Sequence, residues 1–358
     1  MNIPDEIKHT LKTISENNEI DENPKQGANS YTFFAKNKIT GAPSVVKFYY
    51  WGGIDKLHFE PKTLSKLDCK NIIKIFDAGY SSDDYSYFLT EHCEDGDLDT
   101  ADFARISLYQ ALDWTSDMLN GLVQIHSSGH VHRDLKPGNL FLSGSTLKIG
   151  DFGSIAALPQ GKDEVNASNH SILYRPPESF EDGYYTKLSD IYQCGVILYQ
   201  LCGGWLSYRE EDWLRQQELK EYYKLAYPDN TIFADQCIGK RISKGRIINI
   251  STLNAWIPNE VKRLVSKASR LEPKRRFSSV DQFLAKITEV RRSIPNWFWQ
   301  GDDLMMQDSR NCYRIITREK KLIVQQKSAS GDWRNKNKYN GATKVSDLCS
   351  ALTKDAQM

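Results

Sequence analysis

The most informative stretch of the sequence reads His132-Arg133-Asp134-Leu135-Lys136-Pro137-Gly138-Asn139, and Asp151-Phe152-Gly153 begins twelve residues after the asparagine. A carboxylate on a loop can accept the proton of an incoming hydroxyl, which points to a base at Asp134. Amide and carboxylate oxygens are ligands that Mg²⁺ prefers, and Asn139 and Asp151 supply one of each. Residues 140–142 and 147–149 predict a hairpin that returns Asp151 beside Asn139, so the two oxygen donors converge.

With these motifs in this order, the chain resembles the eukaryotic-type Ser/Thr protein kinase family over about residues 19–294. The resemblance implies that Asp134 is the catalytic base and that Lys136 steadies the transferring phosphoryl group. It also implies that Asn139 and Asp151 bind Mg²⁺ on ATP. Lysine two positions after the base is the Ser/Thr form of the motif, so the expected acceptor is a Ser or Thr of a protein substrate.

A second part of the resemblance lies upstream, where Val45-Val46-Lys47 matches the family's third-strand lysine motif. The family pattern implies that Lys47 contacts the α and β phosphates of ATP and pairs with a glutamate on a helix. Glu60 is the expected partner, on a helix that tolerates Pro61 in its first turn. Asp55 is the alternative partner.

The phosphate-cradling loop departs furthest from the family pattern. It reads Gly27-Ala28-Asn29-Ser30-Tyr31-Thr32-Phe33-Phe34, with asparagine and threonine in place of the second and third glycines. Asparagine tolerates a left-handed backbone, and Tyr31 fits the aromatic tip of the loop, so we expect the strand-turn-strand to survive. The loop residues expected to contact the nucleotide are Gly27, Asn29, Tyr31 and Phe34.

The resemblance also assigns an adenine site. Val45 above the base and Phe141 below it are expected to sandwich the ring. Residues 91–93, which include Glu91 and Cys93, resemble the hinge whose backbone reads the edge of adenine. Thr90 then stands at the gatekeeper position and is small.

We expect the residues next to Asp134 and Asp151 to have structural roles. We expect His132 to be a core histidine whose ring packs on Phe152, and neither an acid nor a base. Gly153 completes the Asp-Phe-Gly motif. In the family, the arginine at the position of Arg133 is the cation that receives a phosphate on the activation segment.

The end of the activation segment is recognisable as Tyr174-Arg175-Pro176-Pro177-Glu178. Arg276 stands where the family has the arginine that pairs with this glutamate, and Asp190 stands on the helix that ties down the catalytic loop. Two serines precede the segment end. Ser168 is the expected phosphorylation site, with an ordinary loop serine as the alternative, and Ser171 is expected to contact Asp134 and Lys136.

Composition excludes several other classes. The 358 residues include 47 basic and 46 acidic side chains, a net charge of +1, which fits neither a basic nucleic-acid coat nor an acidic tail protein. Apolar runs are shorter than a membrane helix needs, and the N-terminus lacks the features of a signal peptide, so we expect a cytoplasmic protein. The seven scattered cysteines include no C-x-x-C pair and predict free thiols.

The periodicity of apolar residues predicts an α+β chain in three parts. An amphipathic helix over residues 1–18 precedes a two-lobed kinase fold over 19–294, with a sheet-rich N-lobe at 19–92 and a helical C-lobe at 93–294. Residues 295–358 predict a small α+β accessory module of unknown role. The elements expected outside the motifs are strands at 31–34, 44–49, 72–76, 87–89, 312–317, 321–327 and 332–335, and helices at 108–125, 190–201, 210–225, 258–271, 280–291 and 345–352.

Several alternatives stay open at this point. A pseudokinase that binds nucleotide and serves as a regulatory scaffold is favoured by the altered glycine loop and opposed by the intact Lys47, Asp134, Asn139 and Asp151. A small-molecule kinase is disfavoured by the pairing of Glu178 with Arg276. The accessory module either docks a partner or packs its aromatic side chains on the C-lobe. The basic run at 240–246 is best explained as a solvated face.

Overall fold

The computed structural model describes residues 3–21, 25–26, 30–52, 54, 58–167, 171–318, 321–328 and 330–356. The backbone forms two compact units. The first, the sheet unit, contains Met1–Leu98 and Gly138–Ile155, and the second, the helical unit, contains Asp99–Pro137 and Ala156–Met358. The hairpin that follows the catalytic loop therefore belongs to the sheet unit.

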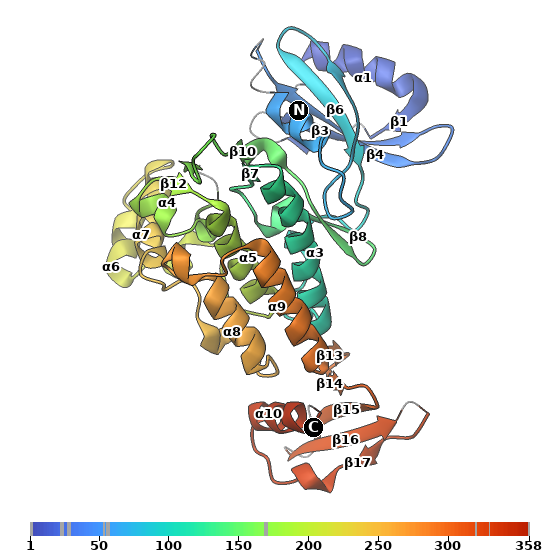
Figure 1. The fold of residues 1–358 in the computed structure, drawn as a ribbon, viewed down its shortest axis with the longest axis vertical. Coiled ribbons are helices and arrows are strands. Elements are labelled where there is room, and N and C mark those ends of the chain that lie inside the picture. Colours follow the sequence, from blue (N-terminus) through green and yellow to red (C-terminus); the bar gives the residue numbers. More distant parts are fainter. Residues whose placement is uncertain are drawn as a thin grey trace. The chain divides into compact units, whose positions relative to one another are not determined.

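An antiparallel sheet forms most of the sheet unit (Figure 1). Its strand order is β1-β3-β4-β6-β5, with β2 beside β3. Strands predicted at residues 31–34 and 44–49 are confirmed as parts of β3 and β4. Alternation along β4 puts the buried Val46 and Phe48 on one face and Lys47 on the other. The strands are β1 Asn18–Ile20, β2 Lys25–Gln26, β3 Ser30–Asn37, β4 Pro43–Tyr50, β5 Ile75–Tyr80 and β6 Tyr85–Glu91.

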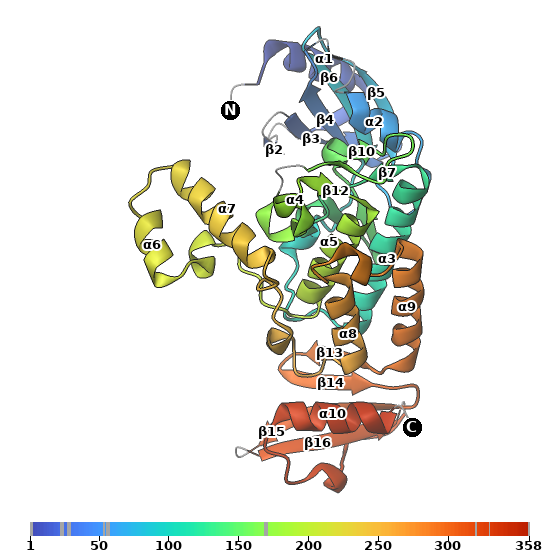
Figure 2. The ribbon, with the colours of Figure 1, turned by 60° about the vertical axis from the view of Figure 1, so that its left-hand side comes forward.

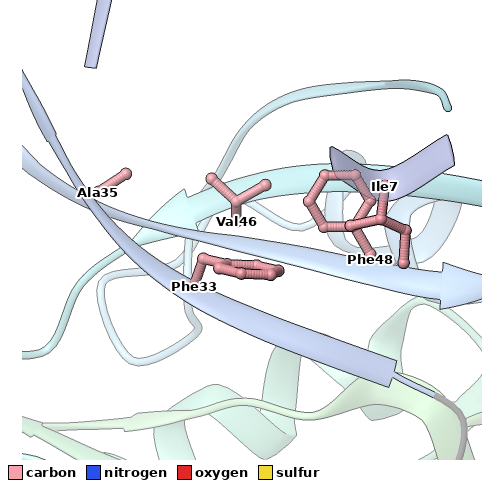
Figure 3. Packing of buried hydrophobic residues seen from close by; sticks show 5 residues of the cluster. All are labelled: Ile7, Phe33, Ala35, Val46 and Phe48. Carbon is pink, nitrogen blue, oxygen red and sulfur yellow. The ribbon is translucent and has the colours of Figure 1, made fainter. Parts of the chain in front are cut away.

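Helix α1, Asp5–Asn17, covers the face of the sheet that carries Val46 and Phe48. Ile7 is fully buried in a cluster with these two residues and Phe33, and the rings of Phe33 and Phe48 meet edge to face (Figure 3). Burying one isoleucine stabilises a fold by about 1.5–3 kcal/mol. The amphipathic N-terminal helix thus shares its core with the sheet.

The predicted hairpin after the catalytic loop is confirmed, because β8 Leu140–Ser143 pairs with β9 Thr146–Ile149. The strand predicted over 72–76 was wrong in its start, since β5 begins at Ile75. The cause is a competing partner: the backbone N–H of Ile73 donates to the carbonyl of Ile149 at 2.9 Å. This segment is therefore joined to the hairpin before it enters the sheet.

Helices form most of the helical unit, and α5 lies at its centre with every side chain from Ser189 to Leu201 buried. A helix that is buried on all sides belongs to the core of a large domain. Among the described residues, no helix is both long and apolar enough to cross a membrane. The helices are α3 Leu108–Ser127, α4 Glu178–Glu181, α5 Lys187–Leu201, α6 Gln216–Tyr222, α7 Asp229–Ile242, α8 Asn259–Ala268 and α9 Val280–Ser293.

The helix predicted over 210–225 is divided. A short 3₁₀ helix covers Glu210–Trp213, and α6 starts only at Gln216. The backbone N–H of Arg215 donates to the Glu218 carboxylate at 2.7 Å, which caps a new helix at this point. Helix α7 was missed, although its buried residues Ala234, Ile238 and Ile242 recur at helical spacing.

The accessory module is confirmed as a sheet with a helix (Figure 2). Helix α10, Val345–Ala356, buries Leu348, Cys349 and Leu352, and its Thr353 hydroxyl accepts a hydrogen bond from Trp297 Nε1 at 3.2 Å. The predicted strands correspond to β15–β17, whereas β13 and β14 were missed. The sheet is an antiparallel meander of β13 Asn296–Gln300, β14 Asp303–Gln307, β15 Asn311–Arg318, β16 Lys321–Ser328 and β17 Arg334–Asn335.

Hydrogen bonds join the first strand of the module to α3. The Tyr109 hydroxyl donates to the carbonyl of Ile294 at 2.8 Å, and the Tyr109 N–H donates to Asn296 Oδ1 at 3.0 Å. The turn after β13 is held as well, because Arg105 Nη1 donates to the carbonyl of Gly301 at 2.8 Å. The module therefore packs on the helical lobe.

Candidate active site

A cavity of about 530 Å³ opens within the sheet unit, between the strands, helix α2 (Phe59–Leu64) and the β8–β9 hairpin. Its wall is mixed, with apolar side chains such as Val45 and Phe88 and with charged residues that include Lys47, Glu60 and Asp151. The described residues singled out from the sequence that line it are Phe34, Val45, Lys47, Glu60, Thr90, Glu91, Cys93, Asn139, Phe141 and Asp151. The cavity is also lined by Ser30, Thr32, Ile73 and Gly150, none of which was predicted to contact the nucleotide.

Lys47 lies between two carboxylates in the wall of this cavity. Its Nζ donates to Glu60 Oε1 at 2.9 Å and Oε2 at 3.0 Å, and to Asp151 Oδ1 at 3.2 Å. Glu60 lies in α2, Phe59–Leu64, with Pro61 in the first turn. Its carboxylate also accepts from the backbone N–H of Phe152 at 3.2 Å, which joins α2 to the turn after Asp151.

The surroundings keep the Lys47 ammonium charged. Burial disfavours the charged form, but the Glu60 and Asp151 carboxylates outweigh burial and raise the pKa of Lys47. Burial raises the pKa of Glu60, and the neighbouring Lys47 opposes that rise. The cavity therefore holds one fixed positive charge that two acidic groups orient.

Asn139 and Asp151 flank the open end of the β8–β9 hairpin, one just before β8 and the other just after β9. The N–H of Gly150 donates to the carbonyl of Asn139 at 2.9 Å, which closes the hairpin one residue before Asp151. Asp151 has a left-handed backbone with φ of 52°, a strained conformation for a residue with a side chain. A Cβ at Gly150 would come within 2.5 Å of Ile73 and 2.7 Å of Phe141, so only glycine keeps this wall open.

Strand β6 carries Thr90, which the family pattern predicts as the gatekeeper, and ends at Glu91, the first residue of the predicted hinge. Thr90 and Cys93 are buried, and burial raises the pKa of the Cys93 thiol to about 11. The Glu91 carboxylate accepts from the Lys74 N–H at 2.7 Å and pairs with Lys148 Nζ at 2.8 Å. Its side chain thus fixes the hinge to β9, a contact between residues 57 apart that sequence reasoning missed.

Tyr31 requires a correction. The family pattern placed it at the tip of the loop against the nucleotide, but it lies in β3 opposite Phe48 and packs on the cluster around Ile7. Strand alternation is the reason, since it turns Ser30, Thr32 and Phe34 into the cavity and Tyr31 away from it. Gly27, Asn29, Asp55 and Ser168 lie outside the described residues.

The helical unit holds the candidate base. Asp134 is buried, and Lys136 Nζ lies 3.0 Å from its Oδ2. The fully buried Asp190 accepts the N–H of His132 at Oδ2 and the N–H of Arg133 at Oδ1, both at 2.9 Å. A carboxylate of α5 therefore fixes the backbone that precedes Asp134.

A second residue of α5 holds the same loop and was missed from the sequence. The Gln193 side chain donates to the carbonyl of Arg133 at 3.1 Å and accepts from the N–H of Leu135 at 3.2 Å. Arg133 is held in a left-handed conformation, with φ of 72°. Its guanidinium donates to the carbonyl of Asn166 at 3.0 Å, and burial lowers its pKa.

The end of the activation segment is anchored by a buried ion pair. Arg276 Nη1 and Nη2 donate to the two oxygens of Glu178, each at 2.7 Å. The Glu178 carboxylate also accepts from the Ser189 hydroxyl at 2.7 Å. His132 and Phe152 are fully buried, but their expected contact and that of Ser171 with Asp134 and Lys136 stay predictions.

A family model described as the protein kinase domain matches residues 26–287. This chain belongs to the protein kinase family. The match covers strands β3–β6 of the sheet and helices α2–α8, and it ends inside α9, before the accessory module.

This chain is similar to several protein kinases, and each similarity covers only part of the relative's length. The serine/threonine-protein kinase Nek11 of Homo sapiens is 34% identical over 155 residues, which are 40% of this chain and 23% of that protein. CBL-interacting protein kinase 32 of Oryza sativa subsp. japonica is 28% identical over 221 residues, 58% of this chain and 50% of that protein. The interferon-induced, double-stranded RNA-activated protein kinase of Mus musculus is 28% identical over 222 residues, 55% of this chain and 43% of that protein. The chain spans half or less of the length of these relatives.

Proposed function

We propose that this kinase transfers the γ-phosphoryl group of ATP to Ser or Thr residues of a protein substrate. We also propose that it phosphorylates its own chain. The observation that carries the proposal is the contact of the Lys47 ammonium with both Glu60 and Asp151 in the wall of a cavity. A charged lysine held in this way is preorganised for anionic phosphates. No feature of the described residues favours the scaffold alternative over this one.

The cavity fits ATP and Mg²⁺ in its shape and in its chemistry. Val45 and Phe141 provide apolar walls for adenine, and Gly150 leaves the space that a Cβ would fill. Asn139 and Asp151 offer hard oxygen ligands to the metal, and Lys47 offers its ammonium to the phosphates. When bound, the nucleotide and metal supply the phosphoryl group and offset its charge.

The helical unit supplies the groups that act on the acceptor. Asp134 accepts the proton of the Ser or Thr hydroxyl. Its carboxylate is buried and is held in place by Lys136 Nζ, 3.0 Å from Oδ2. Lys136 keeps a positive charge beside the reacting oxygen. Asp190 and Gln193 fix the loop backbone, so the base needs no rearrangement to reach its position.

Incubation with Mg²⁺, labelled ATP and a generic basic protein tests the proposal. The natural chain should transfer phosphate to the protein and to itself, and Asp134→Asn should bind nucleotide but transfer little. Lys74→Met is a matched lysine control outside the set of cavity-lining residues and should keep full activity. A natural chain that binds nucleotide with Mg²⁺ but transfers nothing would establish the scaffold alternative.

Three finer proposals accompany the activity. Ser168 is phosphorylated, and Arg133 receives the phosphate; mass spectrometry of the self-phosphorylated chain tests this directly. Strands β15–β17 with α10 dock a protein partner, since these elements lie beyond the strand that is bonded to α3. The kinase acts in the cytoplasm, which fluorescence microscopy of the tagged chain tests.

A further inference from the structure

Four side chains from distant segments of the helical unit form a hydrogen-bonded relay, which we call the tyrosine relay: Tyr174, Gln200, Tyr208 and Asp99. The Tyr174 hydroxyl donates to Gln200 Oε1 at 2.7 Å and lies 2.8 Å from the Tyr208 hydroxyl. The Tyr208 hydroxyl donates to Asp99 Oδ1 at 2.7 Å. None of these contacts belongs to the motifs that identified the family.

The protons of the relay run in one direction. Each tyrosine has one hydroxyl proton, and an ionised carboxylate can only accept. The Tyr208 proton therefore goes to Asp99, and the Tyr174 proton is shared between Gln200 and the Tyr208 oxygen. Burial raises the pKa of Tyr174 well above its usual value and that of Tyr208 to about 12, so both hydroxyls stay protonated at neutral pH.

Burial differs along the relay. Tyr174 and Gln200 are 3% and 4% exposed, so their polar atoms depend on one another for hydrogen bonds. Tyr208 is 54% exposed and Asp99 lies on the surface. The relay thus connects a buried residue of the activation segment to the surface of the lobe.

Tyr174 lies in the chain between two other residues that anchor the activation segment. Asn166 is held by Arg133 of the catalytic loop, and Glu178 is held by Arg276. Tyr174 ends the 3₁₀ turn Ile172–Tyr174 between them, and Gln200 fixes it to the same helix whose Asp190 holds the catalytic loop. The relay therefore sets the position of residues 171–178 relative to the base.

We propose that Tyr208 and Asp99 are positioning residues for the protein substrate. They hold Tyr174, and through it the segment 171–178, at the place where the acceptor peptide is presented to Asp134. This inference rests on the proposed kinase activity. Its consequence is a separation of effects: the relay governs the KM for protein and leaves the KM for ATP unchanged, because the nucleotide cavity lies wholly in residues of the sheet unit.

Steady-state kinetics with Mg²⁺, ATP and a generic basic protein test the relay. Tyr208→Phe removes one hydroxyl and keeps the ring, and Asp99→Ala removes the acceptor of the Tyr208 hydrogen bond. Each should raise the KM for protein by about three- to tenfold, the loss expected for one hydrogen bond, with the KM for ATP within twofold. The KM for protein of the double variant should be no higher than that of the more impaired single variant, because both changes break the same chain of contacts.

A matched control and a second measurement complete the test. Tyr223→Phe alters an exposed tyrosine outside the relay and should leave both KM values unchanged. Hydrogen exchange of residues 171–178 should quicken in Tyr208→Phe but not in Tyr223→Phe, whether or not the chain is active. An unchanged protein KM, or unchanged exchange, overturns the relay. A natural chain that transfers no phosphate refutes the proposed function instead, and exchange then still decides the relay.

Discussion

Removal of residues 294–358 should strongly destabilise the helical lobe, because the first strand of the accessory module is part of its core. Three hydrogen bonds from Tyr109 and Arg105 would be lost, at about 1 kcal/mol each. The ring centroids of Trp256, only 3% exposed, and Trp299 lie 6.2 Å apart. Without Trp299, Trp256 would expose roughly 100 Å² of apolar surface, at a cost of about 2.5 kcal/mol. The sum, about 5 kcal/mol, equals the whole stability of many domains.

Thermal unfolding of the truncated and full chains measures this effect. At about 2–4 °C per kcal/mol for a unit of this size, the truncation should lower Tm by about 10–20 °C and abolish transfer to every substrate. Tyr109→Phe removes a single hydrogen bond and should lower Tm by about 2–4 °C. Arg334→Ala, in the exposed β17, is the matched control and should change Tm by less than about 2 °C. A truncated chain that melts within a few degrees of the full chain and phosphorylates a generic protein normally would refute the reasoning.

Asp134→Asn should lower kcat by at least about 100-fold with nucleotide affinity nearly intact, because it removes the proton acceptor and keeps the shape; comparable kcat values would exclude this base. Asp151→Asn should abolish the Mg²⁺ dependence of nucleotide binding in calorimetry, and a retained dependence would exclude the metal site. Gly150→Ala should weaken ATP binding by about tenfold or more, since its Cβ would intrude on the wall of the cavity; unchanged affinity would show that the wall yields. Glu178→Gln should destabilise the fold by about 3–5 kcal/mol by leaving Arg276 buried without its counter-ion, and a Tm close to that of the natural chain would contradict this.

The parts of the site that could be predicted from the sequence are those carried by short segments with fixed spacing. The hairpin at 140–149 follows from two alternating runs and a turn, and it brings Asn139 and Asp151 to one end because hairpin geometry allows little else. The helix with Glu60 could be placed despite Pro61, because proline is tolerated in a first turn.

The parts that could not be predicted depend on contacts between distant residues or on a choice of face. Lys148 and Glu91 are 57 residues apart, and Tyr208 and Asp99 are 109 apart, so no local pattern marks either pair. Tyr31 illustrates the second limit: a shift of one residue along a strand turns a side chain from the cavity to the opposite face. Strands β13 and β14 were missed for a related reason, since residues 296–300 and 303–307 lack clear alternation and include two methionines.

The polar residues of α5 show why such distant contacts matter in this molecule. Its sequence reads as an apolar core helix, yet Asp190, Gln193 and Gln200 are almost completely buried within it. These residues have partners in two parts of the site. Asp190 and Gln193 bind the backbone of the catalytic loop, and Gln200 binds Tyr174 of the activation segment. A buried polar group without a partner costs about 1–3 kcal/mol. Movement of the loop or the segment away from α5 would leave these buried side chains without partners, so this cost holds both to the helix. One rigid helix therefore fixes the base and the adjoining activation segment relative to each other. A displacement of either one would break hydrogen bonds to these three side chains.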